Sequence, residues 1–134
     1  MKKNICIVVA NYYPKISKAL IDGASKILKK KGIKNYKLIK VAGVFEIPYV
    51  IKKNINKYDA FLALGCVIKG ETPHFNFISM ASINAIMNLS VTFNKPIANG
   101  IITSLNKKQA LARSSKNNNK GKESAKAVIS LLKI

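Results

Sequence analysis

The chain has 134 residues, of which 49% are hydrophobic, so it fits one compact domain over residues 1–134 and is too apolar for a disordered chain. No apolar run approaches the roughly 18 residues of a membrane span, and polar Asn11 follows the N-terminal run where a signal peptide would have its cleavage site, so we expect a cytoplasmic protein. The formal net charge is +19, but the 23 lysines and the single arginine are spread along the chain, which favours only non-specific, salt-sensitive contact with nucleic acid.

The excess of lysine has two explanations, and the sequence leaves both open. The chain is also rich in Ile and Asn, with 19 and 14 residues, so a general drift in composition toward Lys, Ile and Asn accounts for the charge. A surface selected to bind polyanions is the alternative. Since the lysines form no basic tail and do not alternate with aromatic residues, the sequence predicts no sequence-specific nucleic-acid partner.

Apolar runs alternate with segments of helical period along the chain. In chain order, the pattern predicts a strand at 4–10, a helix at 14–31, a strand at 36–42, a helix at 47–56, a strand at 60–68, a helix at 73–92, a strand at 97–103, and helices at 107–114 and 120–132. Strands that alternate with helices join through right-handed crossovers. We therefore expect a three-layer α/β fold, in which a four-stranded parallel sheet has helices on both faces.

Capping and turn residues set the expected helix boundaries. Pro14 suits the first turn of the first helix, and Gly32 ends that helix. The apolar stripe of this helix consists of Ile16, Ala19, Leu20, Ile27 and Leu28. Thr72 is expected to cap the third helix, with Pro73 at its first position.

In folds of this class, ligands bind beyond the carboxyl ends of the strands. Four segments of this chain fall there, namely 11–13, 43–46, 69–74 and 103–105. The residues of unusual type cluster in these segments, so we expect the functional site at this edge.

His74 is the only histidine, and it ends the turn that leads from the third strand into the third helix. The positive end of a helix favours the neutral imidazole, which can accept a proton near neutral pH. Free backbone N–H groups and the Thr72 hydroxyl in the same turn offer an anion site. A histidine that only packs is the alternative.

Arg113 is the only arginine in a chain that uses lysine for every other cation. Its planar guanidinium binds phosphate or carboxylate with paired donors, which a lysine cannot do. Lys116 and Lys120 follow closely and reinforce an anion site. The alternatives are chance retention of the arginine and a solvated helix terminus.

Glu46 and Tyr12 follow the second and first strands. The Glu46 carboxylate suits an acceptor for ligand hydroxyl groups, although it also suits a helix N-terminus. An aromatic ring at Tyr12 or Tyr13 can stack on a planar ligand or can pack as an ordinary half-buried side chain.

The two cysteines, Cys6 and Cys66, both lie in strand-like runs. Their spacing matches no metal-binding or redox motif, so we expect two reduced thiols in the core and no metal site.

Four stretches together resemble the lumazine synthase family. They are VAGVFEIP (41–48), YDAFLALGCVIKGETPHF (58–75), PIANGIIT (96–103) and ARSSKNNNKGKESA (112–125). The resemblance implies a flavodoxin-like fold and a homo-oligomer, either a pentamer or a shell of pentamers. It also implies a cofactor-free condensation of 5-amino-6-(ribitylamino)uracil with 3,4-dihydroxy-2-butanone 4-phosphate, which gives 6,7-dimethyl-8-ribityllumazine.

The same resemblance implies roles for individual residues at the pyrimidine end of the site. Tyr12 would stack on the pyrimidine ring. The ribityl chain would lie against Val44, Phe45 and Glu46, with Glu46 accepting hydrogen bonds from its hydroxyl groups. The residues that would line the pyrimidine are Cys66, Val67 and Ile68.

At the other end of the site, the resemblance implies that Glu71 and Thr72 bind the sugar phosphate. His74 matches the family's proton donor. Arg113 matches an arginine that reaches the phosphate from the neighbouring subunit, and Lys120 and Glu123 match flanking charged positions.

Some features depart from the family pattern. Asn99 stands where the family usually has an aromatic residue that closes the pyrimidine pocket from the adjacent subunit. Glu71 is an acid where a small neutral residue is usual, and Ala42 replaces a common proline. Family members often begin with a further strand that pairs with a neighbour's sheet, whereas this chain starts almost directly at its first core strand. We therefore expect weaker substrate binding and a less stable shell.

Two other functions stay open on the sequence alone. One is a basic binding module that has lost catalysis and binds nucleic acid through its lysines. The other is a shell protein that keeps the fold without the activity. The presence of His74, Arg113, Glu46 and Lys120 favours the enzyme.

Overall fold

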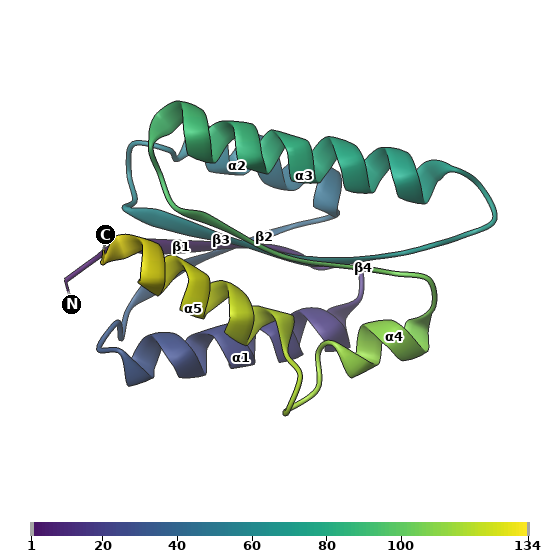
Figure 1. Ribbon diagram of the computed structural model, residues 1–134, viewed down its shortest axis with the longest axis horizontal. Helices are drawn as coiled ribbons and strands as arrows, with labels where there is room; N and C mark the ends of the chain where they lie inside the picture. Colours follow the sequence, from purple (N-terminus) through teal and green to yellow (C-terminus); the bar gives the residue numbers. More distant parts are fainter. Residues whose placement is uncertain (1, 134) are drawn as a thin grey trace.

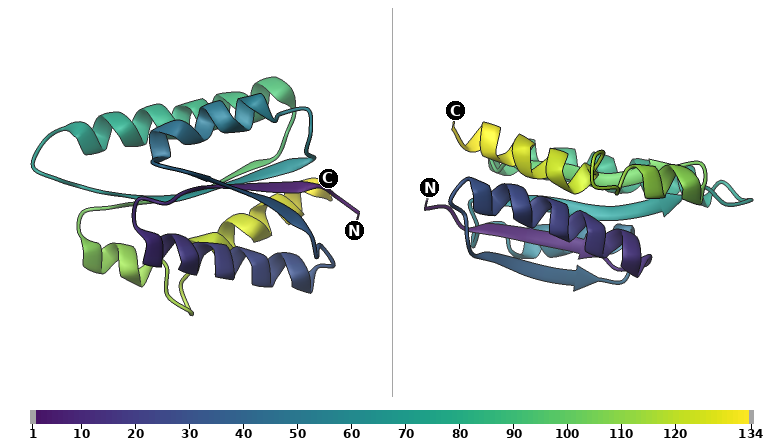
Figure 2. Two further views of the ribbon diagram at one scale, coloured as in Figure 1. Left: turned by 180° about the vertical axis from the view of Figure 1, so that it is seen from behind. Right: turned by 90° about the horizontal axis from the view of Figure 1, so that it is seen from below.

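A computed structural model describes residues 2–133 as three layers (Figure 1). The elements in chain order are β1 (Ile5–Ala10), α1 (Pro14–Lys30), β2 (Tyr36–Val41), the 3-10 turn η1 (Val44–Glu46), α2 (Ile47–Lys53), β3 (Ala60–Ile68), α3 (His74–Phe93), β4 (Ile97–Ser104), α4 (Lys107–Ala112) and α5 (Lys120–Leu132). The sheet lies in the middle, with α2 and α3 on one face and α1, α4 and α5 on the other, as Figure 2 shows from two further sides.

All four strands are parallel and lie in the order β2-β1-β3-β4. Ile7 of β1 lies opposite Leu38 of β2 and Leu62 of β3. The two central strands are covered on both faces, so β1 is buried throughout and β3 is buried as far as Cys66, which explains their continuous apolar sequences. Because the strands are parallel, their carboxyl ends meet at one edge of the sheet, and the segments that lead into the helices leave from that edge.

Each face of the sheet has its own apolar core. On one face, Leu20 of α1 and Val128 of α5 are fully buried against the strands. On the other, Ile51 of α2 and Ile86 of α3 are buried in a separate cluster. Burying a side chain of this size contributes about 1.5–3 kcal/mol, so the two cores fix both helical layers against the sheet.

The predicted fold class is confirmed, and each predicted strand and helix is present. The predicted strand at 60–68 has the bounds of β3, and Pro14 lies in the first turn of α1. The second helix is shorter than predicted and ends at Lys53. It ends there because the side-chain amide of Asn54 donates to the carbonyl of Val50 at 2.8 Å and closes the last turn.

The prediction that Thr72 caps the third helix is wrong. Pro73 takes the N-cap position, no side chain caps the helix, and the first helical residue is His74. The Thr72 hydroxyl instead accepts the backbone N–H of His74 at 3.4 Å, one position too early for a cap. The imidazole therefore lies in the first turn of a helix, where the N–H groups of Asn76 and Phe77 both donate to the Pro73 carbonyl.

Within residues 2–133, no helix has both the length and the hydrophobicity that crossing a membrane requires.

Candidate active site

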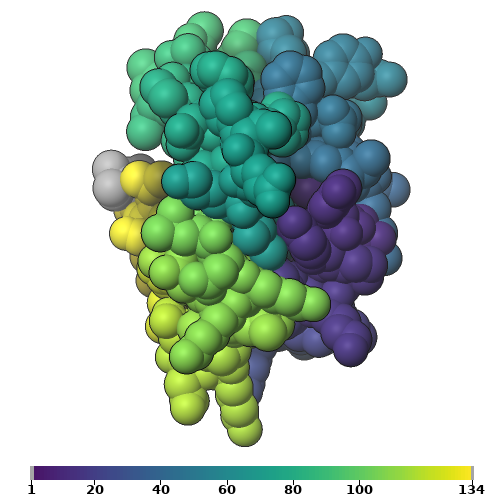
Figure 3. Space-filling view, turned by 90° about the vertical axis from the view of Figure 1, so that its right-hand side faces the viewer, coloured from purple at the N-terminus to yellow at the C-terminus, as the bar shows by residue number. Residues whose placement is uncertain are grey.

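A cavity of about 540 Å³ opens at the carboxyl edge of the sheet. Figure 3 looks onto this edge and shows the purple segment after β1, the blue segment after β2 and the teal segment after β3 close together. The residues that line the cavity are Tyr12, Tyr13, Ala42, Gly43, Val44, Phe45, Glu46, Cys66, Val67, Ile68, His74 and Ile78. Each candidate residue that the sequence placed at the pyrimidine end, except Asn99, therefore lies on one cavity, together with His74.

Two tyrosines after β1 form one wall of the cavity. Their rings meet edge to face, with centroids 4.9 Å apart and planes at 74°. Tyr12 is 71% exposed, so its ring is available to a planar ligand, whereas Tyr13 is half-buried beneath it. Burial raises the pKa of the Tyr13 phenol above 10, and the neighbouring Cys66 and Tyr12 raise it further. Tyr13 therefore keeps its hydroxyl proton near neutral pH.

The turn after β2 presents a carboxylate and a ring to the cavity. Val44 is buried and anchors this turn against the sheet, while Phe45 and Glu46 are exposed. The Glu46 side chain folds back over Gly43, which has no Cβ. A Cβ there would lie only 3.0 Å from the Glu46 Oε1 atom. Within residues 2–133, the carboxylate of Glu46 has no hydrogen bond and no ion pair, so both of its oxygens are free to accept hydrogen bonds from a ligand.

The end of β3 forms the apolar floor of the cavity. Cys66 is buried, and Val67 and Ile68 are half-buried. Burial raises the pKa of the Cys66 thiol from 9.0 to about 11. The thiol therefore stays protonated near neutral pH and contributes apolar surface rather than a nucleophile.

His74 lines the cavity from the first turn of α3, and Ile78 lines it one turn later. The residues before it, Glu71 and Thr72, are exposed and do not line the cavity. They lie in the segment that joins β3 to α3, beside the imidazole. The turn thus combines one acid–base group with backbone donors at its rim.

Besides Glu71 and Thr72, four more candidate residues do not line this cavity: Asn99, Arg113, Lys120 and Glu123. Asn99 lies in β4, the outer strand of the sheet, where its side-chain oxygen accepts the backbone N–H of Ile101 at 3.1 Å.

Arg113 follows α4, is exposed, and donates from Nη1 to the carbonyl of Thr103 at 3.2 Å. Lys120 and Glu123 lie in the first turn of α5, where the backbone N–H of Lys120 donates to the Arg113 carbonyl at 2.8 Å. The structure thus gathers the residues predicted to bind the pyrimidine, except Asn99, and leaves Arg113, Lys120 and Glu123 away from this cavity.

Three residues of the cavity wall were not proposed from the sequence to contact a ligand: Ala42, Gly43 and Ile78. Ala42 and Gly43 directly precede Val44 in the chain. Ile78 lies four positions after His74, which is one helical turn, and this spacing on a helix places two side chains on the same face.

Within residues 2–133, no three His, Cys, Asp or Glu side chains gather in a way that would hold a metal ion. The cavity offers instead an exposed ring for stacking, a free carboxylate for hydroxyl groups, an apolar floor and one imidazole. This set suits a planar, hydroxylated molecule that exchanges a proton during its reaction.

Comparisons with known proteins agree with this description. A family model described as 6,7-dimethyl-8-ribityllumazine synthase matches residues 2–134. The chain is 42% identical to the 6,7-dimethyl-8-ribityllumazine synthase of Buchnera aphidicola subsp. Baizongia pistaciae, over 99% of this chain and 87% of that protein. The chain belongs to the lumazine synthase family.

Other relatives carry the same name. The 6,7-dimethyl-8-ribityllumazine synthase 1 of Rhodopseudomonas palustris is 41% identical over 97% of this chain and 84% of its own length. The synthase of Limosilactobacillus reuteri is 38% identical over 97% of this chain and 88% of its own length. The stretches 41–48 and 58–75, which resemble the lumazine synthase family, both contribute side chains to the cavity.

Proposed function

We propose that this chain catalyses the condensation of 5-amino-6-(ribitylamino)uracil with 3,4-dihydroxy-2-butanone 4-phosphate to give 6,7-dimethyl-8-ribityllumazine, the penultimate step of riboflavin biosynthesis. The observation that carries the proposal is the single cavity that joins Tyr12, Glu46 and His74 in a chain of the lumazine synthase family. Residues 1–134 act as one catalytic domain.

At the pyrimidine end, the exposed ring of Tyr12 stacks on the uracil, and the free carboxylate of Glu46 accepts hydrogen bonds from the ribityl hydroxyl groups. Val44 and Phe45 support the ribityl chain. The floor formed by residues 66–68 contacts the uracil, partly through backbone groups.

The reaction begins when the 5-amino group of the uracil attacks the ketone carbon of the sugar phosphate. An imine forms with loss of water, phosphate is eliminated, and the ring closes with loss of a second water. His74 moves protons at the nitrogen and oxygen atoms that change their bonding. Orientation of two substrates in one cavity supplies much of the acceleration.

At the phosphate end, the turn that leads into α3 and its Thr72 hydroxyl bind the sugar phosphate, with Glu71 at the rim. Arg113 supplies paired donors, and Lys120 and Glu123 flank it. Since Arg113 does not line the cavity of its own chain, it serves the cavity of a neighbouring copy.

The outer face of α3 supports assembly of several copies. None of the 20 residues of α3 is Lys, Arg, Asp or Glu, although 22% of the chain is charged. Four large apolar side chains on this helix are between 62% and 72% exposed: Phe77, Met80, Met87 and Val91. An exposed apolar stripe of this kind marks a protein interface. We propose a homo-oligomer with the pentamer as its smallest unit, and light scattering separates a pentamer from a shell of pentamers.

Two further expectations accompany the proposal. The enzyme works in the cytoplasm and needs no cofactor. Its contact with nucleic acid is non-specific, through exposed lysines such as Lys15, Lys26 and Lys29 on α1.

The test is an absorbance assay for lumazine formation with both substrates, in the presence of a chelator. The proposal predicts that the purified protein forms the product and that the chelator does not inhibit it. If no product forms while nucleic acid binds with a steep salt dependence, the chain is a binding module instead.

A further inference from the structure

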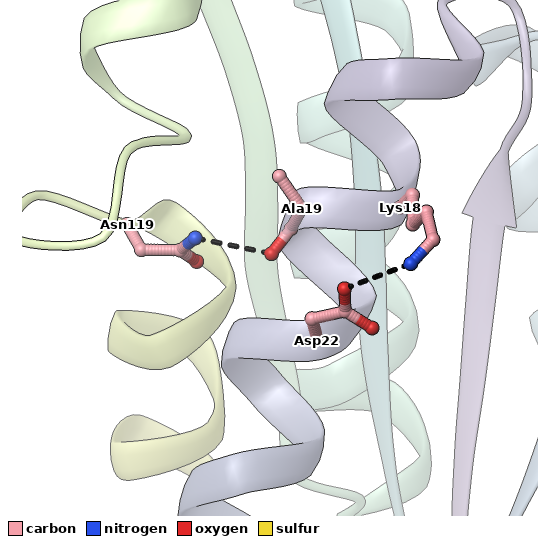
Figure 4. A network of polar contacts seen from close by, with 4 residues as sticks. All are labelled: Lys18, Ala19, Asp22 and Asn119. Atoms are coloured by element: carbon pink, nitrogen blue, oxygen red, sulfur yellow. Dashed lines mark hydrogen bonds and ion pairs between the residues drawn. The ribbon is translucent and has the colours of Figure 1, made fainter.

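The connection between α4 and α5 contains one buried polar side chain. Asn119 is 7% exposed, whereas Asn117 and Asn118 before it are exposed. Its amide nitrogen donates to the carbonyl of Ala19 at 3.1 Å, which Figure 4 shows, and to the carbonyl of Ser114 at 3.3 Å. Its side-chain oxygen accepts the backbone N–H of Lys122 at 3.1 Å and so caps α5.

Two glycines make room for this amide. A Cβ on Gly23 would collide with the side chain of Asn119, and a Cβ on Gly121 would collide with the carbonyl of Leu20. The start of α5 therefore lies directly against the backbone of α1, with the amide between them. Moving this buried amide costs free energy, because the three hydrogen bonds would break and their donors and acceptors would be left buried without water to replace the partners.

The same amide is tied to the backbone that carries Arg113. Residues 114 and 119 form an antiparallel bridge, and the N–H of Lys120 donates to the Arg113 carbonyl at 2.8 Å. The Arg113 guanidinium donates to the Thr103 carbonyl at the end of β4. Arg113 is thus held through its backbone by the start of α5 and through its side chain by the sheet.

We propose that Asn119 is a positioning residue, which fixes the only arginine of the chain in one orientation toward the anionic substrate. Asn119 does not line the cavity, so it acts through Arg113 and not on the substrate. This inference rests on the proposed function, in which Arg113 binds the sugar phosphate. Displacement of a group by about 1 Å can cost 10²-fold, and because Arg113 is proposed to bind the sugar phosphate, the cost should appear in the Michaelis constant for that substrate.

The substitutions that test this proposal remove the two hydrogen bonds that the Asn119 amide donates but keep an acceptor for the N–H of Lys122. Asn119→Asp keeps an acceptor for the Lys122 N–H and loses both donors. Asn119→Ser keeps a shorter acceptor without a charge, and it replaces the Asp variant if that variant does not fold. Asn54→Asp is the matched control, because the Asn54 amide also donates to a helix carbonyl, that of Val50, at the opposite end of the layers.

We expect Asn119→Asp and Asn119→Ser to raise the Michaelis constant for the sugar phosphate by roughly 10- to 100-fold, with turnover and the constant for the pyrimidine nearly unchanged. Asn54→Asp should alter neither constant. In an Arg113→Ala background, Asn119→Ser should have no further effect on the sugar-phosphate constant, because the group that it positions is gone.

Two results would overturn the inference while the unchanged protein forms lumazine. One is an equal rise of both Michaelis constants in the Asn119 variants. The other is a fully additive effect of Asn119→Ser and Arg113→Ala, which would make Asn119 structural alone. Absence of lumazine formation by the unchanged protein is a different result, which contradicts the proposed function and removes the inference with it.

Discussion

The proposed site has a pyrimidine half and a phosphate half. One chain brings together most of the first half, but it does not bring together the second. The pyrimidine half is assembled within one chain, since Tyr12, Glu46 and His74 all line the same cavity. The phosphate half is scattered, because Arg113 follows α4 and does not line the cavity. Asn99, the one pyrimidine candidate outside the cavity, lies on the edge strand β4.

Under the proposed function, a second copy of the chain must therefore complete the site. The cavity floor is apolar, whereas the candidates away from the cavity include the cations Arg113 and Lys120. The uncharged outer face of α3 supplies a surface on which copies can associate.

The largest effect should follow from charging the outer face of α3. Met80→Lys combined with Met87→Lys places two cations on the exposed apolar stripe, where burial of an unpaired charge is costly. We expect dissociation in analytical ultracentrifugation and loss of activity. Ala127→Lys with Ser130→Lys adds the same charge to the exposed face of α5 and should leave both unchanged. Active monomers from the Met variant would refute a shared site.

His74→Ala should lower turnover by about 10²–10⁴-fold and leave residual activity, because the orientation of substrates persists. The rate of lumazine formation, followed between about pH 6 and pH 8, measures the effect. Asn76→Ala, an exposed residue of the same first turns of α3, is the control. If His74→Ala left turnover and its pH dependence unchanged, His74 would have no part in proton transfer.

Arg113→Lys should act on the scattered half of the site alone. Lysine keeps the charge and loses the paired donors, so binding of the sugar phosphate should weaken by about 1–3 kcal/mol. Steady-state kinetics with each substrate varied in turn should show a rise in the Michaelis constant for the sugar phosphate only. A matching rise for the pyrimidine would make Arg113 a structural residue.

The smallest effect concerns Asn99, which offers little apolar area for stacking. If a neighbouring copy brings this position to the pyrimidine, Asn99→Phe should strengthen binding of a pyrimidine analogue by roughly 1 kcal/mol and leave sugar-phosphate affinity unchanged. Calorimetric titration measures the affinity, with the oligomeric state checked in parallel. Equal affinity of the two proteins for the analogue would remove Asn99 from the site.

The sequence predicted well which segments meet at the cavity, for a physical reason. Parallel strands bring their carboxyl ends to one edge, so segments that follow β1, β2 and β3 must meet there. The continuous apolar run of 60–68 also left little freedom in placing β3. The third helix was placed one residue early, because a threonine before a proline looks like a cap, yet its hydroxyl bonds to His74 outside the cap geometry.

The brace at Asn119 could not be predicted, because its partner Ala19 lies 100 residues away in the chain. A run of three asparagines is typical of a polar loop, and no neighbouring residue in the sequence indicates that the third one is buried. Ile78 was not predicted either, although it lines the cavity one helical turn after His74.

Mixing two defective variants tests the central claim, that one site takes its imidazole and its guanidinium from different copies. His74→Ala and Arg113→Ala chains, each with its own affinity tag, are assembled together and purified through both tags. Random mixing pairs an intact His74 with an intact Arg113 of the neighbour at about one quarter of the interfaces, so activity should recover to about that share of the unchanged enzyme. Mixed oligomers with no more activity than the two variants measured separately would contradict the claim.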